Sequence, residues 1–216
     1  MKVGTDGVLL GAWAPIDFHI SSFSHFRILD VGTGSGLIAR MLMQRCPEAE
    51  VEGIDIDAAA VEQARENGVC AFRARLQDWR LDIENCYDLI VSNPPYFQNS
   101  LKNPDEGRKT ARHTDSLSYE ELVKHSARLL REGGQLAVIL PAEAEKEVRQ
   151  IAGAEGFSLT RVTRVYSKES KPARRVILAF SYQLSVISST EDTLILEDEK
   201  GGRSAAYSEL CREFYL

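Results

Sequence analysis

A short apolar segment followed at once by a glycine-rich loop constrains the fold of this chain more than any other feature. Residues 27–31 read as a buried strand, the loop Gly-Thr-Gly-Ser-Gly occupies 32–36, and residues 37–43 read as a helix. Glycines permit positive φ and let a ligand approach the backbone, while a helix start offers unpaired N–H groups. The segment therefore predicts an α/β fold with a cofactor-binding loop at a strand end.

The spacing of this loop and the carboxylates around it indicate the class of cofactor. A dinucleotide fingerprint needs its third glycine one residue later, at Leu37, so a nicotinamide or flavin site is disfavoured. Asp30 suits an ammonium group better than a pyrophosphate. Asp55 follows the strand signal at 51–54 and can accept both hydroxyls of an adenosine ribose. Asp78 follows a further strand-like segment and can accept from an adenine amino group.

Each carboxylate alone is more typical of a helix cap or a solvated loop. Their placement at successive strand ends favours a nucleoside-type cofactor instead. The cofactor-binding residues predicted from this unit and from the next motif are Asp30, Gly32, Gly34, Gly36, Asp55, Asp78 and Asn93.

The tetrapeptide Asn-Pro-Pro-Tyr at 93–96 directly follows an apolar segment and predicts the chemistry. Its prolines fix φ at about −65° and hold the preceding residue extended, so the Asn93 side-chain oxygen and the Pro94 carbonyl can point at one place. A planar amino group that donates one hydrogen to each oxygen loses planarity and becomes a better nucleophile toward a methyl group. Tyr96 can stack on the ring that carries this amino group. The alternative is an ordinary strand end, where paired prolines are common.

The rest of the chain alternates strand-like and helical segments, as a parallel sheet covered on both faces requires. A glycine pair at 133–134 predicts the end of a helix before the next strand. The last two strands of the sheet read as an antiparallel pair. Strands are expected at 27–31, 51–54, 87–92, 135–140, 157–166, 174–183 and 193–197, and helices at 37–43, 119–130 and 143–154.

Charge and composition exclude several classes of protein. No apolar run approaches the roughly 18 residues of a membrane-spanning helix, and neither the cysteines nor the histidines show the spacing of a zinc site or a disulfide framework. We therefore expect a cytoplasmic protein without a metal. The formal net charge of −6 argues against indiscriminate affinity for nucleic acid, so any RNA contact must be local.

The glycine loop, Asp55 and the tetrapeptide together resemble the class I methyltransferases that use S-adenosylmethionine, in particular those that methylate amino groups. The opening of the chain, Met1 to Trp13, looks like that of the bacterial enzymes that methylate N6 of adenine 37 in valine tRNA. The resemblance continues through the late segment 175–180. Members of that family usually carry a short segment upstream of Lys2, which is absent from this sequence, so we expect either a truncated chain or a misassigned start.

The resemblance implies a fold and further site residues. The glycine-rich opening of that family folds over the methionine end of the cofactor, which assigns this role to Lys2, Thr5 and Asp6. Thr5 or Asp6 also reads as a helix N-cap. The implied fold is a seven-stranded, mostly parallel sheet with its last strand antiparallel and helices on both faces. Residues 1–216 would form one domain, with 188–216 as its extension.

The implied substrate is an adenine turned out of the anticodon loop of a tRNA. Asn93 and Pro94 would accept its N6 hydrogens, and Tyr96 would stack on its face. Two basic clusters suit the RNA phosphates, one after the tetrapeptide and one between the last two strands of the sheet. A monomer is expected. The residues predicted to bind RNA are Arg108, Lys109, Arg112, Lys168, Lys171, Arg174 and Arg175.

Three other functions stay open from the residues alone. The same tetrapeptide serves enzymes that methylate a glutamine amide in peptide release factors, because a carboxamide is also a planar amino donor. Only 29 residues precede Asp30, too few for the helical domain that those enzymes usually carry. A methyltransferase of adenine in DNA is the second alternative. A cofactor-binding RNA scaffold without turnover is the third, and the complete tetrapeptide argues against it.

Overall fold

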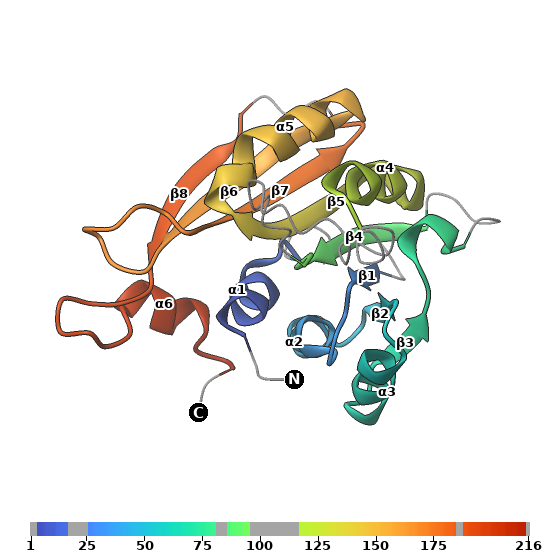
Figure 1. Cartoon of the computed structure of the whole chain (residues 1–216), viewed down its shortest axis with the longest axis horizontal. Helices are drawn as coiled ribbons and strands as arrows, with labels where there is room; N and C mark the ends of the chain where they lie inside the picture. The colour runs from blue at the N-terminus through green and yellow to red at the C-terminus, as the bar shows by residue number, and fades with distance from the viewer. Residues whose placement is uncertain (1–3, 17–25, 81–85, 96–116, 185–187, 215–216) are drawn as a thin grey trace, which may run out of the picture.

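The computed structural model of the chain describes residues 4–16, 26–80, 86–95, 117–184 and 188–214. Its described strands form one eight-stranded sheet in the order β3-β2-β1-β4-β5-β7-β6-β8 (Figure 1). The strands are β1 Arg27–Val31, β2 Glu50–Asp55, β3 Cys70–Arg73, β4 Tyr87–Ser92, β5 Leu130–Pro141, β6 Phe157–Tyr166, β7 Arg175–Tyr182 and β8 Thr190–Ile195.

Strand directions confirm the expected mostly parallel sheet. Strands β1 to β5 pair in parallel with one another, and β7 lies antiparallel between β5 and β6. Strand β8 then adds to the outer edge of β6 in parallel. The carboxyl ends of the parallel strands therefore share one edge with the start of β7, and ligands of open α/β sheets bind at that edge.

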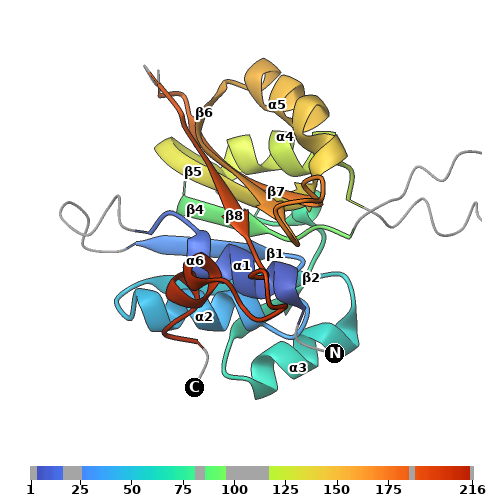
Figure 2. The ribbon, with the colours of Figure 1, turned by 90° about the vertical axis from the view of Figure 1, so that its left-hand side faces the viewer.

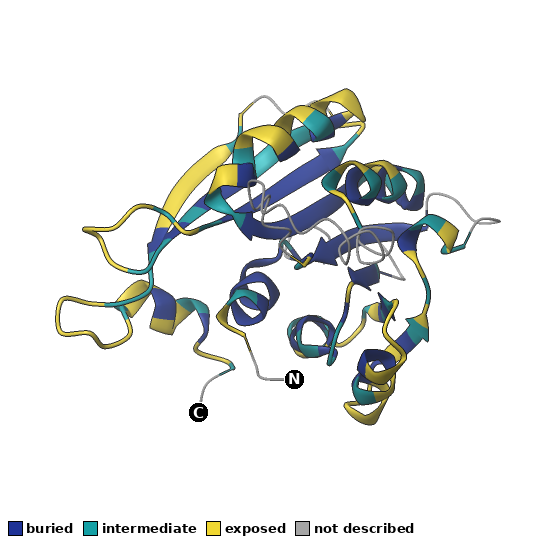
Figure 3. Cartoon of the chain, in the orientation of Figure 1, coloured by how far each residue is buried: buried dark blue, intermediate teal, exposed yellow. Residues whose placement is uncertain are grey.

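Helices cover both faces of the sheet and make three layers (Figures 1 and 2). One apolar core lies between the sheet and the helices α1, α2, α3 and α6, and the other lies between the sheet and α4 and α5. The central strands β1, β4, β5 and β7 are mostly dark blue in Figure 3 because their side chains alternate into both cores, whereas the edge strand β8 is mostly yellow. The helices are α1 Thr5–Trp13, α2 Leu37–Arg45, α3 Ala58–Glu66, α4 Tyr119–Leu129, α5 Glu145–Ala154 and α6 Ala205–Leu210, with 3₁₀ turns η1 Leu76–Asp78 and η2 Ala142–Ala144.

Helix α1 begins differently from the sequence expectation. Its N-cap is Gly4, which provides no side-chain hydrogen bond, and Thr5 and Asp6 lie in the first turn instead. The helix is buried from Gly7 to Trp13 because it packs against the sheet and against its neighbour α2. A Cβ added to Gly11 would approach the Met41 sulfur to 2.7 Å, so a glycine is needed at this helix contact. No described helix is long and apolar enough to cross a bilayer.

Strand β5 starts earlier than predicted. The glycine pair at 133–134 lies inside the strand rather than between helix and strand. Gly133 has φ +76°, and the register of β4 with β5 shifts between Tyr87 and Leu89. Glycine absorbs this irregularity because it adopts positive φ at no steric cost. Helix α4 ends at Leu129, so the strand takes over directly from the helix.

The segment from residue 188 onward extends the sheet. Strand β8 lies at 190–195, three residues earlier than expected at its start, and α6 follows it. Tyr207 and Cys211 from this segment are buried in the same core as α1. The extension is therefore packed onto the body of the fold through both the sheet edge and a helix.

Candidate active site

The glycine loop is held to the end of β2 by its own backbone. The N–H groups of Gly32 and Thr33 both donate to the Ile54 carbonyl, at 2.9 and 3.0 Å. Gly32, Gly34 and Gly36 have φ of +73°, +56° and +80°, which side chains rarely tolerate. The sequence Gly-x-Gly-x-Gly is thus required by three positive φ angles in one turn.

Two of these glycines face different surroundings. A Cβ at Gly36 would lie 2.7 Å from a Val69 methyl carbon and 3.3 Å from the Ala64 Cβ, so Gly36 permits close packing of the loop on the α3–β3 unit. A Cβ at Gly32 would meet nothing within 4 Å. The backbone at Gly32 is therefore open to a ligand, as a cofactor cradle requires.

Asp55 is fixed by the loop that it faces. Its Oδ2 accepts from the Gly34 N–H at 2.9 Å, and its Oδ1 accepts from the Asp57 N–H at 2.9 Å. Each carboxylate oxygen has further lone pairs, so both can still accept a ribose hydroxyl. These two bonds orient the carboxylate before any ligand binds.

Asp30 is fully buried at the base of the loop. Its Oδ2 accepts from Thr33 Oγ1 at 2.8 Å and from the Ala39 N–H at 3.2 Å, while its buried Oδ1 has no hydrogen-bond partner in the described part of the chain. Burial raises the pKa of Asp30 to about 7 against the opposing effect of those hydrogen bonds, and the nearby Asp55 charge raises it further. An unpaired buried carboxylate oxygen at this position fits a cationic ligand group.

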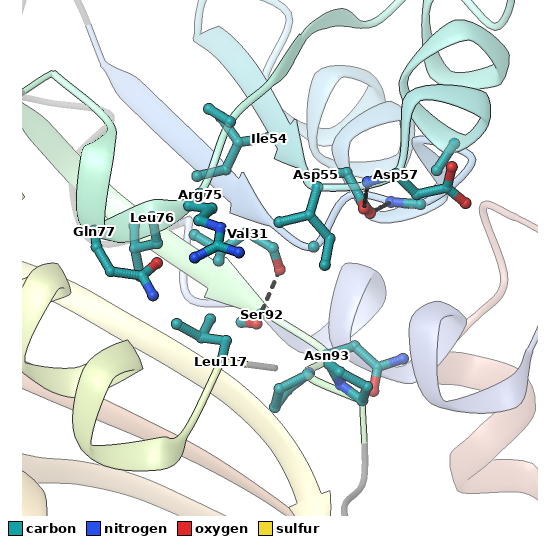
Figure 4. A pocket seen from close by; sticks show the side chains of 17 residues that line it. Val31, Ile54, Asp55, Asp57, Arg75, Leu76, Gln77, Ser92, Asn93 and Leu117 are labelled. Atoms are coloured by element: carbon teal, nitrogen blue, oxygen red, sulfur yellow. Dashed lines mark hydrogen bonds between the residues drawn. The ribbon is translucent and has the colours of Figure 1, made fainter. Parts of the chain in front are cut away.

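A cavity of about 390 Å³ opens beside the loop at the carboxyl edge of the sheet (Figure 4). Its size suits a small organic ligand. Loop backbone and Asp55 form one side, and the segment after β4 forms another. Described lining residues include Gly32, Gly34, Ile54, Asp55, Ile56, Asp57, Leu76, Gln77, Ser92, Asn93, Pro94, Pro95 and Leu117.

The tetrapeptide begins at the rim of this cavity. Ser92, the last residue of β4, donates from its hydroxyl to the Val31 carbonyl at 2.9 Å, which ties the end of β4 to the end of β1. Asn93 and Pro94 follow at once and line the cavity (Figure 4). The predicted amide acceptor and the glycine loop thus lie at one cavity. Tyr96 lies outside the described residues, so its stacking role stays a prediction.

Comparison with known proteins adds a family to this geometry. Residues 18–161 match the Methyltransferase small domain family. A tRNA1(Val) (adenine(37)-N6)-methyltransferase of Bacteroides fragilis is 44% identical over all of this chain and 91% of its own length. One of Erwinia tasmaniensis with the same name is 40% identical over all of this chain and 89% of its own length.

The chain belongs to the tRNA1(Val) (adenine(37)-N6)-methyltransferase family.

Solved structures support the fold of this family member. A crystal structure described as a predicted O-methyltransferase of Agrobacterium tumefaciens has a TM-score of 0.74 at 18% identity, and the match covers 96% of this chain and 95% of that one. A geranyl diphosphate C-methyltransferase of Streptomyces coelicolor, solved with S-adenosyl-L-homocysteine, has a TM-score of 0.52 at 13% identity, with 74% of each chain covered. The predicted class I methyltransferase fold is confirmed. The methyltransferase family match, together with similar structures described as S-adenosylmethionine dependent, supports S-adenosylmethionine as the cofactor.

Three residues predicted from the loop and strand ends to bind the cofactor, Asp30, Gly36 and Asp78, do not line the cavity. Asp78 is exposed and lines a neighbouring depression with Arg73 and Ile56, whereas Gln77, one residue earlier, lines the cavity. The sequence reading placed a strand end here, but η1 is a 3₁₀ turn, so adjacent residues point in different directions. A contact of Asp78 with adenine stays a prediction.

The N-terminal residues of the family motif are only partly described. Lys2 lies outside the described residues, and Thr5 is exposed in the first turn of α1. Asp6 accepts through Oδ2 from Arg175 Nε at 2.9 Å. The structure therefore brings together one residue predicted to bind cofactor and one predicted to bind RNA.

The predicted RNA-binding residues divide into two groups. Arg108, Lys109 and Arg112 lie outside the described residues. The other group lies on the β6–β7 hairpin, where Lys168 pairs with Glu197 at 3.3 Å and Lys171 and Arg174 are exposed. Across the described ranges, no cluster of histidine, cysteine, aspartate and glutamate is arranged to hold a metal ion.

Proposed function

We propose that this protein transfers a methyl group from S-adenosylmethionine to N6 of adenine 37 in valine tRNA. The observation that carries the proposal is that Asn93 and Pro94 line the same cavity as the glycine loop and Asp55. The relatives, which are named for this activity, support the same substrate. As part of this proposal, we take the protein to be a single-domain monomer that acts on tRNA in the cytoplasm.

The cavity and the base of the glycine loop offer suitable groups for each part of the cofactor. The open backbone at Gly32 leaves room for the ligand, and the unpaired oxygen of Asp30, which is buried at the base of the loop and does not line the cavity, is the proposed partner for its ammonium group. Asp55, held by the Gly34 N–H, is positioned to accept the ribose hydroxyls. When bound, S-adenosylmethionine supplies an electrophilic methyl group.

Asn93 and Pro94 prepare the acceptor nitrogen. The Asn93 side-chain oxygen accepts one N6 hydrogen of the adenine and the Pro94 carbonyl accepts the other, which localises the lone pair on N6. Transfer of the methyl group to N6 would break its bond to the cofactor sulfur and leave S-adenosylhomocysteine, while the nitrogen would become cationic and its extra proton strongly acidic. Water can take that proton, so no dedicated strong base is needed. Catalysis then rests on alignment and exclusion of water, which can each contribute several kcal/mol.

A labelling experiment tests this function. The protein is incubated with methyl-labelled S-adenosylmethionine and, separately, total tRNA, DNA or a peptide release factor. Label in tRNA, recovered as N6-methyladenosine, is the expected result. Label in DNA or in the release factor would overturn the substrate, and absence of transfer despite cofactor binding would favour a scaffold. Mass spectrometry of tRNA nucleosides from cells lacking the protein should show loss of N6-methyladenosine from a valine isoacceptor.

A further inference from the structure

Most cations near the β6–β7 hairpin are already paired with acids. Six basic residues lie between Arg161 and Arg175, and four of them have an acidic partner among the described residues. The pairs are Arg161–Asp192 at 2.9 Å, Arg164–Glu145 at 2.7 Å, Arg164–Glu191 at 3.1 Å, Lys168–Glu197 at 3.3 Å and Arg175–Asp6 at 2.9 Å. The hairpin is therefore much less positive than its sequence indicates.

Strand β8 and Glu197, two residues after it, supply three of these five acids. Strand β8 pairs in parallel with β6, and its successive side chains point to opposite faces of the sheet, as in any pleated strand. Asp192 meets Arg161 on the face of α1, where the Arg161 guanidinium also lies over the Trp13 ring. Glu191 meets Arg164 on the face of α5. The outer edge of the sheet (Figure 2) thus has its cations neutralised on both faces.

Lys171 and Arg174 differ from the other four cations. Both are exposed, and neither side chain makes an ion pair or hydrogen bond within the described residues. The Arg174 backbone is fixed, because its N–H donates to the Val165 carbonyl at 2.9 Å and its carbonyl accepts from the Ala142 N–H at 3.3 Å. These two cations are therefore available to an anion without breaking an internal ion pair.

The two cations lie at the edge of the sheet that holds the candidate active site. Ala142 follows the carboxyl end of β5, and β5 pairs with β4, whose carboxyl end leads into Asn93. Only β5 separates β4 from β7 in the sheet. An RNA strand that places a base at Asn93 can therefore reach the hairpin tip along one edge.

We propose that the substrate RNA contacts this hairpin through Lys171 and Arg174 alone. The acids of β8 neutralise the cations of β6 and so keep the RNA phosphates away from the outer edge of the sheet. The inference rests on the proposed function, since it assumes an RNA substrate. Phosphates over Arg161 or Arg164 would lie beside Asp192 or Glu191, and like charges in contact oppose binding. Phosphates at the hairpin tip meet two unpaired cations.

The salt dependence of binding tests the inference. Each phosphate contact contributes about one to the slope of log Kd against log salt concentration. For a valine tRNA transcript and protein saturated with S-adenosylhomocysteine, Lys171→Gln and Arg174→Gln should each lower that slope by about one, and the double variant by about two. The matched control Arg161→Gln removes the same charge from a paired site and should leave the slope unchanged.

A gain-of-binding variant gives a second readout. Asp192→Asn keeps an acceptor for the Thr163 hydroxyl but removes the charge that neutralises Arg161, so RNA affinity should rise a few fold. An unchanged slope in Lys171→Gln/Arg174→Gln, or an equal fall in Arg161→Gln, would overturn the inference. Thermal melting checks that each variant folds. Methylation of tRNA by the wild-type protein tests the proposed function separately, so failure of one is distinguishable from failure of the other.

Discussion

The Arg175 guanidinium donates through Nε to Asp6 Oδ2 at 2.9 Å and so joins two segments that lie 169 residues apart in the chain. Asp6 is in the first turn of α1, and Arg175 is the first residue of β7. The ion pair fixes the start of α1 at the carboxyl edge of the sheet, where the cofactor cavity opens. Arg175 therefore belongs with the N-terminal segment more than with the hairpin cations.

Disrupting this pair should affect cofactor binding more than stability. Both side chains are partly exposed, at 31% and 24%, so Asp6→Asn or Arg175→Gln should cost less than about 1 kcal/mol of unfolding free energy. Each variant should raise the Kd for S-adenosylhomocysteine several fold by calorimetry, and the double variant should be no weaker than either single one. Arg212→Gln, which breaks the exposed pair with Glu209, is the control. Additive effects would show that the two residues act separately.

The loop glycines should separate folding from binding. Gly32→Ala and Gly36→Ala both place alanine at positive φ, at a cost of about 1–2 kcal/mol. Gly36→Ala should lower the free energy of unfolding by about a further 1–3 kcal/mol, because its Cβ would clash with Val69. Denaturant melts measure the difference. Gly32→Ala should instead lose cofactor affinity beyond its loss of stability, since its Cβ projects into open space; equal affinity would argue against a ligand at Gly32.

Removing the Asp55 carboxylate should weaken cofactor binding first. Hydrogen bonds to a charged group contribute about 1.5–3 kcal/mol, so Asp55→Ala should raise the cofactor Kd by roughly ten- to a hundredfold. Asp55→Asn keeps an acceptor for the Gly34 or Asp57 N–H and should be intermediate. Calorimetry with S-adenosylhomocysteine measures both. An unchanged Kd in Asp55→Ala would remove Asp55 from the cofactor site.

The pKa of Asp30 predicts a pH dependence with a definite sign. The pKa is raised from 3.8 to about 7 in the folded chain, so between these values the folded state holds more protons than the unfolded state. The stability of the free protein should therefore fall as pH rises through this window, and Asp30→Asn should abolish that part of the fall. Urea melts across the pH range test the slope.

A cationic partner should make Asp30 favour its ionised form over its protonated form. If the cofactor ammonium pairs with the carboxylate, binding favours its ionised form and must release a proton near about pH 6. Calorimetry in buffers of different ionisation enthalpy measures this release, and Asp30→Asn is the control. Proton uptake, or the same release in Asp30→Asn, would contradict the assignment.

Local patterns were enough to predict that the glycine loop, Asp55 and Asn93 lie together, because each of them directly follows or ends a strand. The glycine loop follows β1, Asp55 ends β2, and Asn93 follows β4, so knowing that parallel strands share a carboxyl edge was enough to bring them together. The helix at 119–129 was likewise visible, and the Ser118–Glu121 capping box fixes its start. Apolar periodicity also marked the strands of the central sheet, because each strand is one continuous segment of the chain.

Features that depend on distant partners were not predictable from local pattern. The start of β8 is polar and exposed, and Asp192 at this end of the strand pairs with Arg161 of β6. A hydrophobic pattern therefore marks only the end of that strand, near Leu194. The pairing of Asp6 with Arg175 has no local signal at all. Gln77 was missed because the sequence does not distinguish the 3₁₀ turn from a strand end.

The central claim, that Asn93 prepares the acceptor amine while other groups hold the cofactor, is tested most directly by single-turnover methylation of valine tRNA by Asn93→Ala, alongside calorimetry with S-adenosylhomocysteine. Losing an aligned transition-state hydrogen bond typically costs about a hundredfold or more in rate. We expect at least that loss, with the cofactor Kd nearly unchanged and the melting temperature close to that of the wild type. A methylation rate within a few fold of the wild type would contradict the claim.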